Sequence, residues 1–244
     1  MKEFDVADAD PSGKEPMNQG KTLHREFVGM LFALAIAEVA VRSGAVANSD
    51  VDLWSKAPAL SHLLLAATVI GTSWVGWGQS KSSLSNIEHI FTWDFVELTI
   101  DVWLVGVYFF IVQGAEAMQG AAGTGAVQGS LHVEALWVMV MFWTYFVWDV
   151  LTKWKKPEGE LIQRGWASLV CAVIASWEYF ALGGLVGTKP VVLADLSLLF
   201  LVLVFRAMKR ETFSDLTRSN WAWIMGLLVA WGLLSLAACA GSPQ

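Results

Sequence analysis

The sequence predicts an all-α integral membrane protein, a bundle of seven transmembrane helices with a cytoplasmic N-terminus and a C-terminus outside. Three observations predict this fold class. The chain of 244 residues is 55% hydrophobic and only 16% charged, its mean hydropathy is +0.52, and its basic residues collect on alternate sides of seven apolar stretches. A helical span needs about 20 apolar residues, so we expect a multi-pass protein of a cell or inner membrane.

The apolar stretches follow a polar segment in residues 1–25, which has mixed charge and no apolar periodic run, and which we expect to be a flexible cytoplasmic tail. One transmembrane domain over residues 26–242 follows, without room for a soluble enzyme domain. The Gly- and Ala-rich stretch 113–131 carries no basic residue, and we expect it to be a flexible tether. The predicted spans are 27–46, 59–79, 88–112, 133–152, 163–186, 190–207 and 220–241.

The distribution of Lys and Arg predicts the orientation of the bundle. Short cytoplasmic loops retain basic residues. With the N-terminus inside, thirteen of the 16 Lys and Arg residues fall on inner segments, whereas Arg42, Lys56 and Lys189 fall outside. This partition favours the arrangement with the N-terminus inside and the C-terminus outside.

Composition and cysteine usage exclude several classes of function. The formal net charge of −6 gives no support for nucleic-acid binding, which usually requires a clustered basic surface. Cys171 and Cys239 form no CxxC motif and no His/Cys cluster, so neither a disulfide framework nor a zinc site is indicated. We expect no cofactor.

The sequence lacks the residues that three known classes of membrane protein need. A retinal protein needs a Schiff-base lysine in its last span, and residues 220–241 contain none. The intramembrane zinc hydrolases of the ceramidase and progestin-receptor type need a histidine pair in that span, which is also absent. No span carries the arginine at every third position that a voltage sensor needs.

Acidic residues within the third span are the most informative feature of the chain. Asp94, Glu97 and Asp101 occur at positions i, i+3 and i+7, so a helix brings them to one face, and Tyr108 lies on the same stripe. The span contains no Lys or Arg. A stripe of carboxylates cannot face lipid, and it must line a hydrated cavity, bind cations or hold protons.

Further acids could continue this path toward the outer surface. Glu178 and Asp195 lie in the outer halves of their spans and have no basic residue at helical spacing within the span. Glu38 could join them, although Arg42 at i+4 also fits a structural ion pair. Surroundings rich in oxygen suit hard cations or protons. By contrast, Glu134 begins its span at the outer surface, where we expect it to be solvated or paired. His62 and His132 lie near the outer ends of their spans, where a histidine pair could ligate haem or a metal but where interfacial histidine is more often solvated.

The first functional hypothesis is a channel or secondary transporter that moves a cation and/or protons along these intramembrane carboxylates. Asp94, Glu97 and Asp101 would bind the moving ion, and Glu178, Glu38, Asp195 and Tyr108 would extend the route. The competing interpretation of the same residues is a polar network that fixes helix packing. Acids that are capped by donors in a dry, sealed interior would favour that network over conduction.

The second hypothesis is a non-transporting membrane subunit, which would act as a receptor, anchor or assembly partner. Its basic inner loops, residues 152–164 and 206–220, could meet an acidic partner, another subunit of a homo-oligomer or complex, or anionic lipid headgroups. An intramembrane enzyme ranks last, because the sequence shows no nucleophile or metal cluster.

Overall fold

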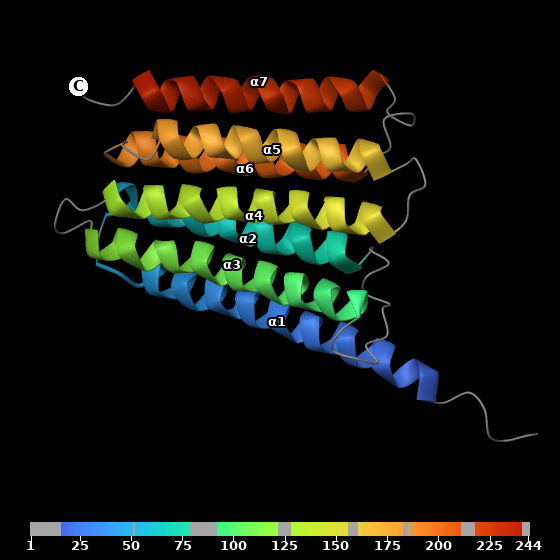
Figure 1. The fold of residues 1–244 in the computed structure, drawn as a ribbon. Helices are drawn as coiled ribbons and strands as arrows, with labels where there is room; N and C mark the ends of the chain where they lie inside the picture. Colours follow the sequence, from blue (N-terminus) through green and yellow to red (C-terminus); the bar gives the residue numbers. More distant parts are fainter. Residues whose placement is uncertain are drawn as a thin grey trace, which may run out of the picture.

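The computed structural model describes residues 16–50, 52–78, 92–121, 128–155, 161–182, 185, 187–210 and 218–240. Over this part of the chain the structure is all helical and contains no strand (Figure 1). Six helices contain a segment long and apolar enough to cross a membrane, and the apolar segment of α7 runs over Ile224–Ala240. The helices are α1 (Pro16–Ala47), α2 (Leu53–Gly78), α3 (Trp93–Ala121), α4 (Gln128–Lys155), α5 (Leu161–Leu182), α6 (Thr188–Arg210) and α7 (Arg218–Ala240).

These helices confirm the prediction of an all-helical, multi-pass membrane protein, with six of the seven predicted spans long and apolar enough to cross a membrane. Several helices extend past the predicted apolar spans. α1 begins at Pro16, inside the segment 1–25 predicted to be a tail, and residues 1–15 lie outside the described part. Proline fits the first turn of a helix, where its missing N–H has no intrahelical partner to lose. The predicted tether 113–131 is likewise helical up to Ala121 and again from Gln128. Polar and small residues thus prolong the helices beyond the apolar stretches.

Asp52 defines the beginning of α2. Its carboxylate accepts hydrogen bonds from the hydroxyl of Ser55 at 2.7 Å and from the Ser55 amide at 3.1 Å, as an N-cap residue does. These two hydrogen bonds hold the pKa of Asp52 below its ordinary value, and the bond from the Ser55 hydroxyl has the larger effect. The cap therefore stabilises the helix start above the ordinary pKa of an aspartate, and this contribution is lost as the pH falls.

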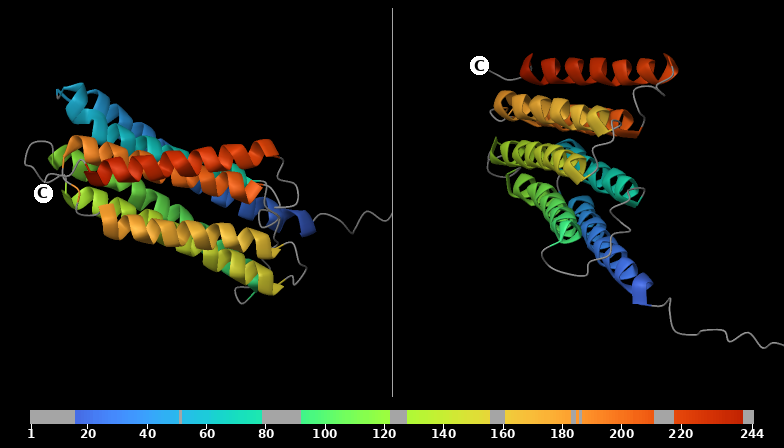
Figure 2. Two further views of the ribbon diagram at one scale, coloured as in Figure 1. Left: turned by 90° about the horizontal axis from the view of Figure 1, so that it is seen from above. Right: turned by 45° about the vertical axis from the view of Figure 1, so that its right-hand side comes forward.

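Consecutive helices alternate in direction, so α2, α4 and α6 run the same way, and the described chain starts and finishes at opposite ends of the bundle (Figure 1). α2 packs against α3 and α6, and α4 packs against α3, α5 and α6. α1 covers α2 and α3, whereas α7 lies mainly against α6 (Figure 2). The core therefore lies among α2, α3, α4 and α6.

Candidate functional site

Two layers of polar side chains lie inside this core. α2, α4 and α6 each carry one polar residue in the first layer and a second one eleven residues later. Eleven residues are about three helical turns, so both residues share one face and lie about 16 Å apart along the axis. The three pairs are His62 and Ser73 on α2, Glu134 and Tyr145 on α4, and Asp195 and Arg206 on α6.

The first layer is the His62–Glu134–Asp195 cluster. The exposed fractions of these residues are 0%, 0% and 1%, respectively. His62 Nδ1 lies 2.5 Å from Glu134 Oε2, and potential ligand atoms of all three residues lie within 4.8 Å of one another. Ser61 donates a hydrogen bond to Asp195 Oδ2. Three helices thus bring an imidazole and two carboxylates together in a fully buried place.

The second nitrogen of His62 fixes the hydrogen-bond pattern of the cluster. Nε2 lies 2.5 Å from the carbonyl oxygen of Ile111 on α3. A carbonyl only accepts, so Nε2 must carry the hydrogen, and Nδ1 is left facing the carboxylates. The close approach depends on Gly114, because a Cβ at that position would lie 2.8 Å from His62 Cε1 and 2.9 Å from Nε2.

The two carboxylates of the cluster have too few hydrogen-bond donors. Among the described residues, no group donates a hydrogen bond to Glu134 Oε1 or to Asp195 Oδ1, and both atoms are buried. An ionised carboxylate that is buried without compensation costs several kcal/mol. The cluster therefore requires a proton or a cation between its oxygens.

The second layer is the Arg206 cluster. Arg206 Nη2 donates to Ser73 Oγ at 2.5 Å and to Tyr145 OH at 2.9 Å, and the guanidinium lies 5.3 Å from the centre of the Tyr145 ring. The Tyr108 hydroxyl is 2.6 Å from that of Tyr145. The predicted path residue Tyr108 therefore belongs to a hydroxyl chain around an arginine.

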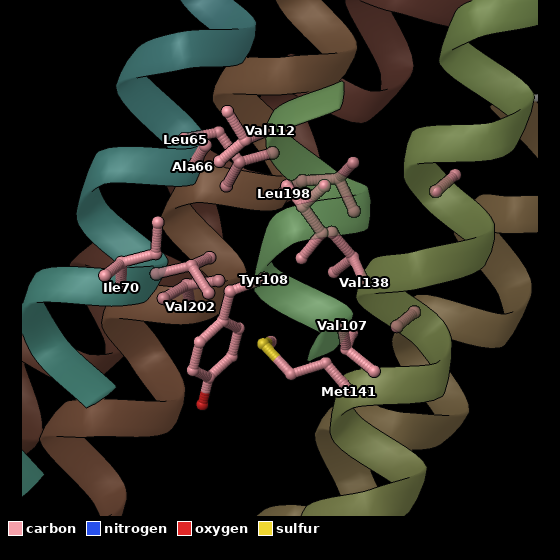
Figure 3. Packing of buried hydrophobic residues seen from close by; sticks show 14 of the residues in the cluster. Leu65, Ala66, Ile70, Val107, Tyr108, Val112, Val138, Met141, Leu198 and Val202 are labelled. Carbon is pink, nitrogen blue, oxygen red and sulfur yellow. The ribbon is translucent and has the colours of Figure 1, made fainter. Parts of the chain in front are cut away.

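Buried apolar side chains fill the space between the two polar layers (Figure 3). Each of the four core helices contributes, and Tyr108 lies at the edge of this apolar layer, with its hydroxyl pointing away from it. No ion can cross such a layer without rearrangement of the helices, because apolar side chains cannot replace its hydration. The layer includes Leu65 and Ile70 of α2, Val107 of α3, Val138 and Met141 of α4, and Leu198 and Val202 of α6.

The acidic stripe of α3 lies on the same side of this layer as the Arg206 cluster. Asp101 is 6% exposed and accepts a hydrogen bond of 3.0 Å from Trp77 Nε1. Glu97 and Asp94, about one and two turns nearer the start of α3, are half-buried. The stripe thus leads from the end of the bundle to a buried aspartate.

Glu178 of α5 has several hydrogen-bond donors at one carboxylate oxygen, Oε1, whereas its Oε2 is buried and has none among the described residues. Its Oε1 accepts from Trp231 Nε1 at 2.7 Å and from Ser235 Oγ at 3.4 Å, both on α7, and also from Ser197 of α6. Ser197 and Asp195 are two residues apart on one helix and point to opposite sides. This arrangement has the features of a packing network and joins Glu178 to α7.

Glu38 pairs within its own helix. Its Oε1 lies 2.7 Å from Arg42 Nη2, and the Arg42 Nε hydrogen bond has the same length. This is the ion pair that the i, i+4 spacing predicts as the structural alternative. Arg42 also acts electrostatically on His62, so the ion pair belongs to the surroundings of the cluster.

The structure therefore distributes the seven predicted path residues over different sets of neighbours. Only Asp195 enters the His62–Glu134–Asp195 cluster. The expectation of a solvated His62 is wrong, because helix packing buries it. Glu134, which we expected to be solvated or paired, is also buried and is paired with His62. The spacing of eleven residues on three spans was the available signal for this cluster. Comparison of the chain with protein-family models, curated proteins and solved structures gave no match.

Proposed function

We propose that this protein is a membrane carrier that moves protons or a cation and that the His62–Glu134–Asp195 cluster is its binding site. The observation that carries the proposal is a fully buried pair of carboxylates whose Glu134 Oε1 and Asp195 Oδ1 lack donors among the described residues. A mobile positive species would supply the missing compensation. Such intramembrane acids commonly serve ion and proton pathways.

Burial of the site favours a carrier over an open channel. A conducting channel needs a hydrated route, whereas His62 and Glu134 are 0% exposed and the apolar layer separates them from the Arg206 cluster. A carrier holds its cargo in a closed state and opens to one side at a time. The described conformation fits such a closed state.

The remaining predicted residues take different roles in this proposal. With the N-terminus inside, the stripe of Asp94, Glu97 and Asp101 lies toward the cytoplasm and attracts cations to the inner entrance. The His62–Glu134–Asp195 cluster then lies toward the outside. Glu178 holds α5, α6 and α7 together and takes no part in binding.

Flux into liposomes tests the proposal. Purified protein is reconstituted with a pH-sensitive or potential-sensitive dye inside, and gradients of protons, K⁺, Mg²⁺ or Mn²⁺ are imposed. The wild-type protein should give a signal with at least one gradient. The double variant Glu134→Gln, Asp195→Asn should reduce the initial rate at least tenfold, since amides keep the shape of the site and remove its charge.

A matched control separates loss of charge at the site from general damage. Asp149→Asn removes another intramembrane carboxylate of α4, and the new amide oxygen still accepts from Lys209, which lies 3.1 Å from Asp149 Oδ1. This variant should transport like the wild type. Full flux in the double variant would contradict the proposal, and a wild-type protein that moves none of these ions would favour the non-transporting subunit.

A further inference from the structure

The His62–Glu134–Asp195 cluster offers a mixed set of metal ligands. His62 presents Nδ1 and the two acids present carboxylate oxygens, all within 4.8 Å of one another. One imidazole nitrogen with two carboxylates suits Mn²⁺, Fe²⁺, Co²⁺ or Zn²⁺ better than Na⁺, K⁺ or Mg²⁺, because imidazole is a ligand of transition metals. The acids of the predicted path indicated oxygen ligands only, and the packing of α2, α4 and α6 adds the His62 nitrogen.

His62 and Asp195 are each held by a hydrogen bond to a second group, as metal ligands in proteins commonly are. Metal-binding histidines donate their other ring N–H to a carbonyl or carboxylate. His62 Nε2 does so to the Ile111 carbonyl at 2.5 Å, which leaves Nδ1 directed at the acids. Asp195 in turn accepts from Ser61 through Oδ2, which leaves Oδ1 without a donor among the described residues.

The charge of the cluster also fits a divalent ion. Glu134 and Asp195 supply two negative charges, and His62 is a neutral ligand when Nε2 alone carries a hydrogen. The nearby positive charge of Arg42 is already paired with Glu38 at 2.7 Å. A divalent cation would therefore neutralise the buried carboxylates, whereas a single proton would leave one negative charge uncompensated.

We propose that the cargo of the carrier is a divalent first-row transition-metal ion, bound by His62 Nδ1 and by one carboxylate oxygen each from Glu134 and Asp195. This inference rests on the proposed function, whose site it shares. Three protein ligands leave positions free for water or for a further group, which suits an ion that must enter and leave.

Binding of Co²⁺ and Mn²⁺ to the purified full-length protein in detergent tests the inference. We expect one Co²⁺ per chain by metal analysis, visible absorption bands typical of Co²⁺ with nitrogen and oxygen ligands, and a melting temperature that rises with Mn²⁺ but not with equal Mg²⁺. His62→Gln, Glu134→Gln and Asp195→Asn should each weaken Co²⁺ binding at least tenfold. Asp149→Asn should bind like the wild type.

Ser61→Ala probes the groups behind the ligands. It removes the donor to Asp195 and no ligand atom, and loss of such a group typically weakens metal binding about 10–100-fold. We expect a fall at the lower end of that range. If a ligand variant fails to fold, the melting temperature of the wild-type protein still tests the metal site, because it should rise with Mn²⁺ and not with Mg²⁺.

The results distinguish failure of this inference from failure of the proposed function. Proton or K⁺ flux that depends on Glu134 and Asp195, without Co²⁺ binding or Mn²⁺ flux, would overturn the metal site and leave the carrier intact. Co²⁺ binding that the three ligand variants abolish, without flux of any ion, supports the site and contradicts transport. Equal Co²⁺ binding in the wild type and all three variants would overturn the inference.

Discussion

Hydrogen-bond donors distinguish the buried acids of this bundle from one another. Glu178 receives three donors at Oε1 and none at Oε2, whereas neither carboxylate oxygen of Glu134 receives a hydrogen bond from the described residues. The cost of burying a carboxylate depends on such donors. Glu178 therefore fits a structural role, and Glu134 fits a site whose compensation comes from a bound species.

Substitution of Glu178 should affect stability. Glu178→Ala leaves Trp231 Nε1 without its acceptor, and Ser197 and Ser235, whose hydroxyls lie 2.6 Å apart, can then satisfy only one of their two hydrogens with each other. Each unsatisfied buried group costs about 1–3 kcal/mol. We expect a loss of at least about 2 kcal/mol in unfolding free energy, against less than about 1 kcal/mol for Glu178→Gln, which keeps an acceptor oxygen. Denaturation in mixed micelles measures both. Equal stability of the alanine and glutamine variants would contradict the packing network.

The Arg206 cluster should show coupling between its members. Arg206→Met removes the donor of the 2.9 Å hydrogen bond, and Tyr145→Phe removes its acceptor hydroxyl while the ring beneath the guanidinium is kept. A double-mutant cycle should therefore give an interaction energy of about 0.5–3 kcal/mol. Ser176→Ala, on α5, is the control partner and should add to Arg206→Met within about 0.5 kcal/mol. Additive effects of Arg206→Met and Tyr145→Phe would contradict an interaction between the two side chains.

At the scale of the helices, hydropathy predicts which segments cross the membrane but not how each helix is rotated. The stripe of Asp94, Glu97 and Asp101 could be predicted because all three lie on one helix. The His62–Glu134–Asp195 cluster depends on how α2, α4 and α6 pack, which no property of a single span specifies. Helix boundaries were also missed where polar residues prolong α1 and α3 beyond the apolar core.

The contact between α2 and α3 depends on Gly114. In Gly114→Ala, the new Cβ would lie 2.8 Å from the His62 ring, so the ring or the helix must shift. We expect a loss of about 1–3 kcal/mol in stability and weaker Co²⁺ binding.

Gly106→Ala on the same helix is the matched control. Its Cβ meets nothing within 4 Å, so alanine should keep metal binding and raise stability by up to about 1 kcal/mol through its helix propensity. Melting temperature and Co²⁺ titration of both variants measure the difference. A Gly114→Ala protein that matches Gly106→Ala in both would contradict the close approach.

At the scale of the whole molecule, seven alternating helices place the ends of the described chain on opposite sides of the bundle (Figure 1). The positive-inside rule predicts that the N-terminal end of the bundle faces the cytoplasm. An epitope tag at the C-terminus should be accessible to antibody on intact cells, and an N-terminal tag only after permeabilisation. Accessible N-terminal tags on intact cells would reverse the assignment of the entrance beside Asp94 and Glu97.

The decisive quantity for the carrier is the initial rate of ion movement in liposomes that contain equal amounts of wild-type protein, Asp195→Asn or Asp149→Asn. We predict flux for the wild type and for Asp149→Asn, and at least a tenfold lower rate for Asp195→Asn, which removes one charge from the His62–Glu134–Asp195 cluster. An Asp195→Asn protein that moves ions as fast as the wild type would show that this cluster is not the binding site.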